Sequence, residues 1–131
     1  MIRPVSVAVL LAVAATTPVA AQNMPLPAFV ERATKLEKKG PLALFHKGEI
    51  NALMTEMRGA NERLRADRVA AEERGGNPGY CIPKERKGVR VGWGSQELLR
   101  ELRAIPAAQA RTMNTTDGMR VLLAKRYPCR T

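Results

Sequence analysis

Two cysteines are the residues of this chain whose chemistry is easiest to foresee. Cys81 and Cys129 are the only cysteines among its 131 residues. Such a pair can form a disulfide, share a metal ion or act as a redox couple. A redox couple usually has the spacing Cys-x-x-Cys, and a metal site needs further ligands, whereas His46 is the only histidine. The pattern therefore favours a structural disulfide, with a metal pair and a redox pair as the alternatives.

The other polar residues do not form a pattern typical of catalysis. A hydrolytic triad needs a usable base, and His46 carries the only imidazole of the chain. The acidic residues are scattered among basic neighbours, so no two of them suggest a paired general acid and base. Gly88-x-x-x-Gly92-x-Gly94 does not follow a strand and open a helix, as a dinucleotide fingerprint would. We therefore expect a protein that is not an enzyme, with no cofactor and no metal site.

The first 21 residues have the pattern of a cleaved signal peptide. Arg3 supplies a positive start, an apolar run follows over 5–15, and small residues at 18–21 precede a cleavage position before Gln22. An uncleaved membrane anchor is the alternative, but the apolar run is short for a membrane span. We therefore expect a signal peptide over 1–21 and a single exported domain over 22–131, in a compartment where disulfides form.

The composition and periodicity of the exported part predict a helical bundle. Aromatic residues make up only 4% of the chain, so its core must consist of aliphatic and alanine side chains, which pack well between helices. Apolar residues repeat with helical spacing over 27–39, 49–74, 95–105 and 115–127, and Pro41 and Pro106 begin two shorter predicted helices over 41–47 and 107–113. The predicted fold is an all-α, small single-domain bundle of about five helices, with one long helix and one disulfide.

The four longer predicted helices each have an apolar stripe that should face the core. The stripes consist of Phe29, Val30, Ala33 and Leu36; of Ile50, Leu53, Met54, Met57, Ala60 and Leu64; of Leu98, Leu99, Leu102 and Ile105; and of Met119, Leu122, Leu123 and Tyr127. Two prolines predict an extended linker over 22–27. Ser95, and either Thr115 or Thr116, are the expected N-caps of their helices. Gly118 departs from the pattern, because a helix former is expected at its position.

The chain is strongly basic, with a formal net charge of +10 and a pI near 10.5. Such a charge favours an acidic protein, an anionic lipid surface or nucleic acid as the partner, and export argues against nucleic acid. A solvated basic surface without a specific partner is the alternative. We expect no stable membrane insertion, because the apolar faces of the helices are needed for the core.

The candidate partner-binding residues are one tryptophan and four arginines of the long helix. They are Trp93, Arg58, Arg63, Arg65 and Arg68. Trp93 lies between two glycines, and a tryptophan in that setting either anchors a partner or covers the helices as a hydrophobic plug. The arginines alternate with acidic residues, so they form either a binding surface or a solvated helix held by ion pairs four residues apart.

Three motifs of the last third of the chain resemble the Rap/Tai-type immunity proteins. They are Gly79-Tyr80-Cys81-Ile82-Pro83, a helix containing Glu97-Leu98-Leu99, and Tyr127-Pro128-Cys129. Proteins of that family are small, exported and all-helical, are commonly dimeric, and protect the periplasm of Gram-negative bacteria against amidase effectors of type VI secretion.

The resemblance implies a location, a partner and a role. We expect a periplasmic protein that inhibits an acidic effector, a cell-wall amidase, by occluding its active site, with a homodimer as the expected assembly. Cys81 and Cys129 would form the structural disulfide of the family. No inhibitory residues are carried over, because no matching motif for them is present.

A second interpretation is a periplasmic stress protein without a toxin partner. Small helical proteins with two distant cysteines are also similar to the HdeA-type acid-stress chaperones, which expose apolar surface when acidified. With a single histidine, such opening would have to be driven by the carboxylates. Suppression of client aggregation at low pH would distinguish this interpretation from the immunity role.

The pairing of the cysteines is directly testable by thiol titration. We expect no free thiol when the exported protein is unfolded without a reductant, because both cysteines are consumed by one disulfide. A reagent that absorbs on reaction with thiolates would measure this in denaturant, and a reduced sample serves as the control. Two free thiols in the unreduced sample would contradict the prediction.

Overall fold

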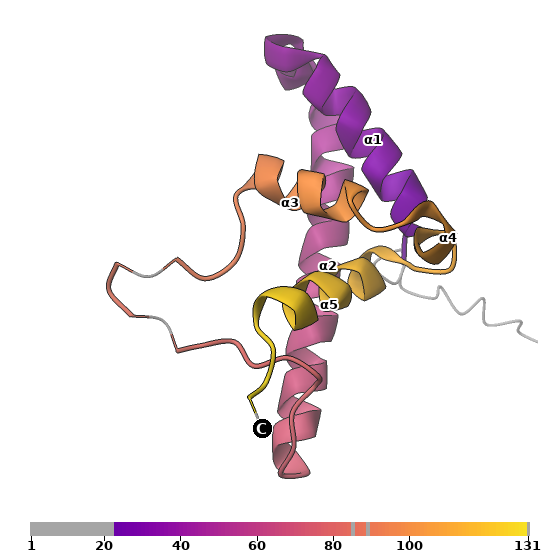
Figure 1. Ribbon diagram of the computed structural model, residues 1–131. Coiled ribbons are helices and arrows are strands. Elements are labelled where there is room, and N and C mark those ends of the chain that lie inside the picture. Colours follow the sequence, from indigo (N-terminus) through magenta and orange to yellow (C-terminus); the bar gives the residue numbers. More distant parts are fainter. Residues whose placement is uncertain (1–22, 85, 89, 131) are drawn as a thin grey trace, which may run out of the picture.

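The computed structural model describes residues 23–84, 86–88 and 90–130 (Figure 1). The predicted signal peptide lies outside the described residues. The elements are α1 (Leu26–Lys38), the 3-10 helix η1 (Gly40–Phe45), α2 (Lys47–Glu73), α3 (Ser95–Arg103), α4 (Ala107–Ala110) and α5 (Thr115–Arg126). The described part has helices and one isolated bridge between Pro25 and Asn114, so the all-α prediction is confirmed. Within it, no helix is both long enough and apolar enough to cross a membrane.

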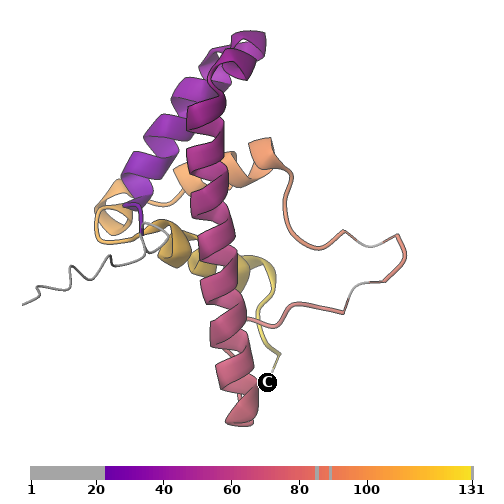
Figure 2. The same ribbon diagram turned by 180° about the vertical axis from the view of Figure 1, so that it is seen from behind.

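The long helix α2 is the axis of the molecule, and the other helices lie along or across it. η1 joins α1 to α2 at one end of the hairpin that they form, and α3 and α5 cross α2 on the side of α1 (Figures 1 and 2). α5 packs on α2, while α1 contacts both α3 and α5. Gly40 ends α1 with a φ of 53°, a conformation that glycine adopts without strain. The predicted boundary between the first two helices is therefore confirmed.

Most of the buried apolar side chains form two adjoining clusters. The first contains Met24, Leu26, Phe29, Leu53, Leu102, Ile105 and Leu122, and the second contains Leu64, Tyr80, Met119 and Leu123. The predicted stripes supply most of these residues. The assignment of Met54 to the core is wrong, because its side chain is 52% exposed.

The segment before α1 is a buried strap and not a free linker. The Met24 amide donates a hydrogen bond to Glu56 Oε1 of α2 at 2.9 Å, and the Met24 carbonyl accepts one from the Thr115 amide at 3.0 Å. The Leu26 amide donates to the Met113 carbonyl at 2.9 Å. Glu56 is 2% exposed, so its carboxylate serves this internal contact. The prediction of a linker was wrong. The partners that bury this segment lie far away in the sequence, so no local pattern marks it as buried.

The predicted N-caps are also corrected by the structure. Ser95 is the first residue of α3, where Gly94 is the N-cap and no side chain caps the helix. Asn114 caps α5: its Oδ1 accepts from the Asp117 amide at 2.8 Å, and Asp117 Oδ2 accepts from the Asn114 amide at 3.1 Å. Thr115 is buried instead, and its hydroxyl donates to the Met24 carbonyl.

Gly118 occupies a helical position because its neighbours leave no room for a side chain. A Cβ atom there would lie 2.9 Å from both Leu26 methyl carbons and 3.3 Å from Leu102 Cδ2. Leu26 is completely buried, so it has little freedom to move away. The glycine thus lets α5 approach the first turn of α1 closely, at the cost of helix propensity.

The close approach at Gly118 predicts that Gly118→Ala destabilises the protein. Overpacking against Leu26 should outweigh the gain in helix propensity and lower the free energy of unfolding by about 1 kcal/mol. Urea denaturation followed by far-UV circular dichroism would measure the change. Gly48→Ala in α2 is the matched control, because a Cβ atom added at Gly48 would meet no other atom within 4 Å. The control should stabilise by about 0.5 kcal/mol, and an equal gain at both sites would contradict the packing argument.

Candidate functional site

The disulfide fixes the two ends of the last third of the chain to one another. Cys81 and Cys129 are bonded with a Cα–Cα distance of 4.9 Å and a sequence separation of 48. The Cys81 amide donates a hydrogen bond to the Tyr127 carbonyl at 2.8 Å. The predicted disulfide is confirmed, and it ties the segment that follows α2 to the end of α5.

The segment after α2 doubles back along the last turns of that helix (Figures 1 and 2). The Gly75 amide donates to the Glu72 carbonyl and the Gly76 amide to the Ala71 carbonyl, both at 2.9 Å. With Gly75 at a φ of 75°, this is a Schellman ending, which turns the chain sharply. The charged end of α2 is therefore covered on one side by its own continuation.

Tyr80 anchors the returning segment in the core. Its side chain is 2% exposed, and its hydroxyl donates a hydrogen bond to the Leu64 carbonyl at 3.3 Å. Burial raises the pKa of the Tyr80 hydroxyl above its ordinary value. The ring packs with Leu64, Met119 and Leu123, so one aromatic residue joins the loop to α2 and α5.

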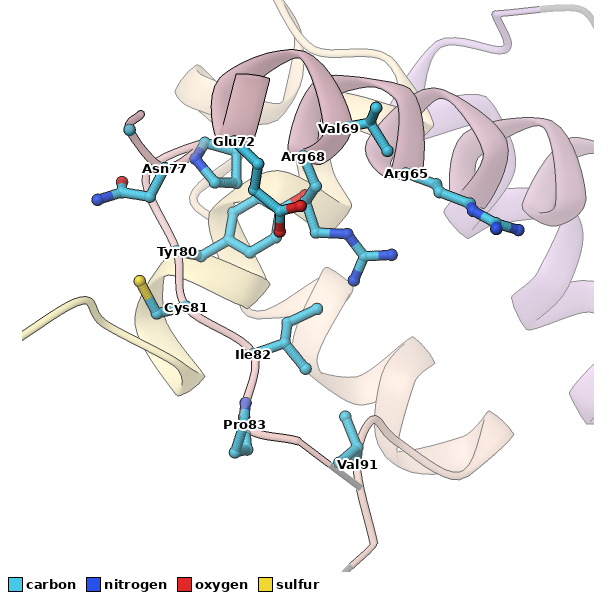
Figure 3. Close-up of a pocket in the computed structure, with 12 residues that line it drawn as sticks. Arg65, Arg68, Val69, Glu72, Asn77, Tyr80, Cys81, Ile82, Pro83 and Val91 are labelled. Carbon is cyan, nitrogen blue, oxygen red and sulfur yellow. The ribbon is translucent and has the colours of Figure 1, made fainter. Parts of the chain in front are cut away.

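A cleft of about 610 Å³ lies between the end of α2 and the returning segment (Figure 3). Arg65, Arg68, Val69 and Glu72 line it from α2, and Gly76, Asn77, Pro78, Tyr80, Cys81, Ile82, Pro83 and Val91 line it from the loop. The Arg68 side chain points into the space above Ile82, whereas the Arg65 side chain extends along α2 toward the rim of the cleft (Figure 3). The cleft thus combines a basic wall with an apolar one.

The electrostatic balance of this cleft is positive. Among the described side chains, no ion pair involves Arg65 or Arg68, and Glu72 is the one acid that lines the cleft. Four further cations, Lys84, Arg86, Lys87 and Arg90, are exposed on the loop that continues from Pro83. Arginines without an internal carboxylate partner can pair with carboxylates of a bound molecule.

A second cavity, of about 390 Å³, adjoins the first. Met57, Leu64, Trp93, Leu98 and Met119 are among its lining residues, and it shares Arg68, Tyr80, Ile82 and Val91 with the cleft. It is the more apolar of the two, because side chains of both core clusters reach it. The two hollows together form a continuous surface beside α2.

Trp93 is half-buried and packs as a plug over the helices. Its ring meets that of Tyr127 edge-on at 6.2 Å, and the Arg126 guanidinium lies 4.9 Å from the ring centre of Trp93. The Gly92 amide donates to the Tyr127 hydroxyl at 2.9 Å, which fixes the backbone beside the tryptophan. The structure therefore gives Trp93 a packing role, and one part of it also lines the second cavity.

The four candidate arginines occupy different environments. Arg65 and Arg68 line the cleft, and Arg58 lies exposed two turns earlier, on the same face as Arg65 by helical spacing. Arg63 faces α5 instead: its Nε donates to Thr116 Oγ1 at 2.8 Å, and its Nη2 lies 3.7 Å from Glu56 Oε1. Arg63 thus holds α2 against α5, so the cleft depends on Arg65 and Arg68.

The described residues do not gather the ligands of a metal site. No group of three or more His, Cys, Asp and Glu side chains among them could hold a metal ion. His46 lies exposed beside η1, where Lys39 Nζ is 3.2 Å from its Nε2.

The arrangement of charges at the cleft is suited to binding an anionic group.

The sequence reasoning missed the apolar wall of the cleft. Tyr80 and Ile82 belong to a loop rich in glycine and proline, so no periodicity marks them as buried or lining residues. One usable signal was present, because Cys81 must approach the end of α5 to form the disulfide, which places its neighbours against the same helix.

Comparison of the chain with protein-family models, with curated proteins and with solved structures yields no match. The resemblance to the Rap/Tai-type immunity proteins therefore remains a prediction based on the three motifs.

The packing of Trp93 predicts that Trp93→Ala lowers the stability of the domain. We expect a loss of about 2 kcal/mol in the free energy of unfolding, less than for a fully buried ring, because the side chain is partly exposed. Chemical denaturation followed by circular dichroism would measure it. Arg65→Ala is the control and should change stability by less than about 0.5 kcal/mol. Equal stability of both variants would contradict the packing role.

Proposed function

We propose that this protein is an exported, non-enzymatic binding protein that holds an acidic protein partner at the cleft beside α2. The observation that carries the proposal is the pair Arg65 and Arg68, which lines an open cleft without an ion-pair partner among the described side chains. The role closest to the sequence motifs is that of a periplasmic immunity protein, which occludes the active site of a cell-wall amidase.

The wall opposite the arginines gives the binding surface its apolar part. Ile82, Pro83 and Val91 lie across the cleft from α2, and Val69 is 47% exposed on α2 itself. Protein interfaces gain affinity from apolar contact in the centre and specificity from charged pairs around it. A convex acidic segment of a partner, with one or two apolar side chains, would match this arrangement.

The cleft is held in shape before any partner arrives. The disulfide, the Schellman ending of α2 and the buried Tyr80 each fix the loop wall, and Arg120 pairs with Asp67 at 2.6 Å to fix α2 on α5. A preorganised surface loses little conformational entropy on binding. Occlusion of an enzyme by such a rigid surface requires no chemistry of its own.

The net charge supports association with an acidic partner. Arg3 is the one charged residue of the predicted signal peptide, so its removal leaves a net charge of +9. A charge of this sign and size accelerates the encounter with an acidic protein and makes the association sensitive to salt. The exposed cations of the loop, among them Lys84, Arg86 and Arg90, follow the cleft in the chain and extend its positive field.

The proposal predicts that neutralising the cleft arginines abolishes capture of the partner. The exported protein would serve as bait in a periplasmic extract of its own organism, alongside an Arg65→Gln/Arg68→Gln variant. We expect one stoichiometric acidic partner that high salt releases, and at least about a tenfold weaker affinity for the variant. Inhibition of the captured protein's cell-wall amidase activity would support the immunity role.

A variant with the same loss of charge controls for the overall field. Arg100→Gln/Arg111→Gln removes two exposed arginines from α3 and from the end of α4, and it should bind as the unchanged protein does. Equal weakening of both variants would show that net charge and not the cleft governs binding. If no partner is captured, the binding role is contradicted and the acid-stress interpretation gains ground.

A further inference from the structure

The connection between α1 and α2 carries an apolar surface that the core does not use. η1 lies at the end of the α1–α2 hairpin, beyond the other helices (Figures 1 and 2). Leu42, Leu44 and Phe45 are exposed by 63%, 71% and 84%, and η1 has no buried residue. Three large apolar side chains in two turns of 3-10 helix form a projecting patch, which we call the hairpin tip. Contiguous exposed apolar surface of this kind marks a site of interaction.

Lysines surround the hairpin tip, and the nearby acids are already neutralised. Lys38, Lys39 and Lys47 are exposed on the turns directly before and after η1. Glu37 pairs with Arg103 at 3.3 Å. Glu49 accepts two hydrogen bonds from Arg32, at 2.5 Å and 2.7 Å. The electrostatic potential at the tip is therefore positive and is set by the lysines.

We propose that the hairpin tip docks the protein reversibly on an anionic phospholipid bilayer. Leucine and phenylalanine side chains would enter the boundary between headgroups and acyl chains, and the flanking lysines would contact the lipid phosphates. The long lysine side chains can extend to the headgroups while the apolar side chains lie deeper. This docking uses a tip and not a spanning helix, so it does not need a helix long and apolar enough to cross a membrane, and the described residues contain none.

A bilayer fits the hairpin tip better than a second copy of the chain or a folded partner does. The tip is convex, so a protein partner would need a matching apolar hollow with acidic surroundings. The two hollows that a second copy offers beside α2 are both lined by Arg68, and the larger one also by Arg65. Bringing lysines against those arginines would be repulsive. A fluid anionic surface needs no preformed hollow.

This docking would orient the rest of the molecule. α2 begins at the hairpin tip and reaches the cleft near Arg68, about 30 Å farther along the helix axis at 1.5 Å per residue. The cleft would therefore stay in water above the membrane and remain open to a partner. The docking inference stands on the tip alone and does not depend on the proposed partner.

Vesicle binding of the exported protein tests the inference. Flotation with vesicles of phosphatidylcholine alone, and with added phosphatidylglycerol, should show binding to the anionic vesicles. Leu44→Ser/Phe45→Ser should weaken that binding at least about tenfold, and Lys38→Gln/Lys47→Gln about fivefold for each lysine. Both variants should keep the thermal unfolding curve of the parent, because the altered side chains are exposed.

Matched variants separate the tip from general basicity. Val121→Ser replaces an exposed apolar residue of α5, and Lys84→Gln/Lys87→Gln removes two loop lysines; neither should weaken vesicle binding by more than about twofold. The inference is overturned if the tip variants bind anionic vesicles as the parent does, or if the loop lysines matter as much as those at the tip. It is also overturned if the tip variants change only the oligomeric state in light scattering, which would make the tip a contact between copies.

Discussion

The disulfide between Cys81 and Cys129 is the constraint on which the arrangement depends, because it closes the return segment onto α5. Cross-linking a loop of this size restricts the unfolded chain by about 4 kcal/mol in the entropy model, which is comparable with the whole stability of a small domain. Contacts of α5 then connect the disulfide to the rest of the helices. Its Thr115 holds the strap before α1, its Gly118 admits Leu26, and its Arg120 pairs with Asp67 of α2.

Local signals in the sequence predicted the helices well, and contacts between distant residues account for the errors. Gly40 and Gly75 end their helices with a positive φ, a backbone geometry that glycine adopts most easily, so the sequence alone predicts these boundaries. Asn114 was missed as the cap of α5 because adjacent threonines offer the same chemistry. The Thr115 hydroxyl instead donates a hydrogen bond to the Met24 carbonyl, which lies 91 positions away in the sequence.

The same distinction explains what could be foreseen of the candidate site. Helical spacing places Arg58, Arg65 and Arg68 on related faces of α2, and this much follows from the sequence. Whether an arginine is free for a partner depends on what packs beside it. Arg63 meets Thr116 of α5, whereas Arg65 and Arg68 meet a loop wall of uncharged residues. That difference arises only when the disulfide and Tyr80 bring the loop against α2.

α2 is longer than a core of this size needs, and its two ends serve two different surfaces. At one end Ala71 is buried beneath the returning chain, so the last turns form one wall of the cleft. At the other end the helix joins η1, which contacts α1 and α2 and leaves Leu42, Leu44 and Phe45 exposed. A single helix thus separates an apolar, lysine-flanked tip from an arginine-lined cleft. At 1.5 Å per residue, about 30 Å of helix lies between the tip and Arg68, so contacts made at the two ends would not overlap.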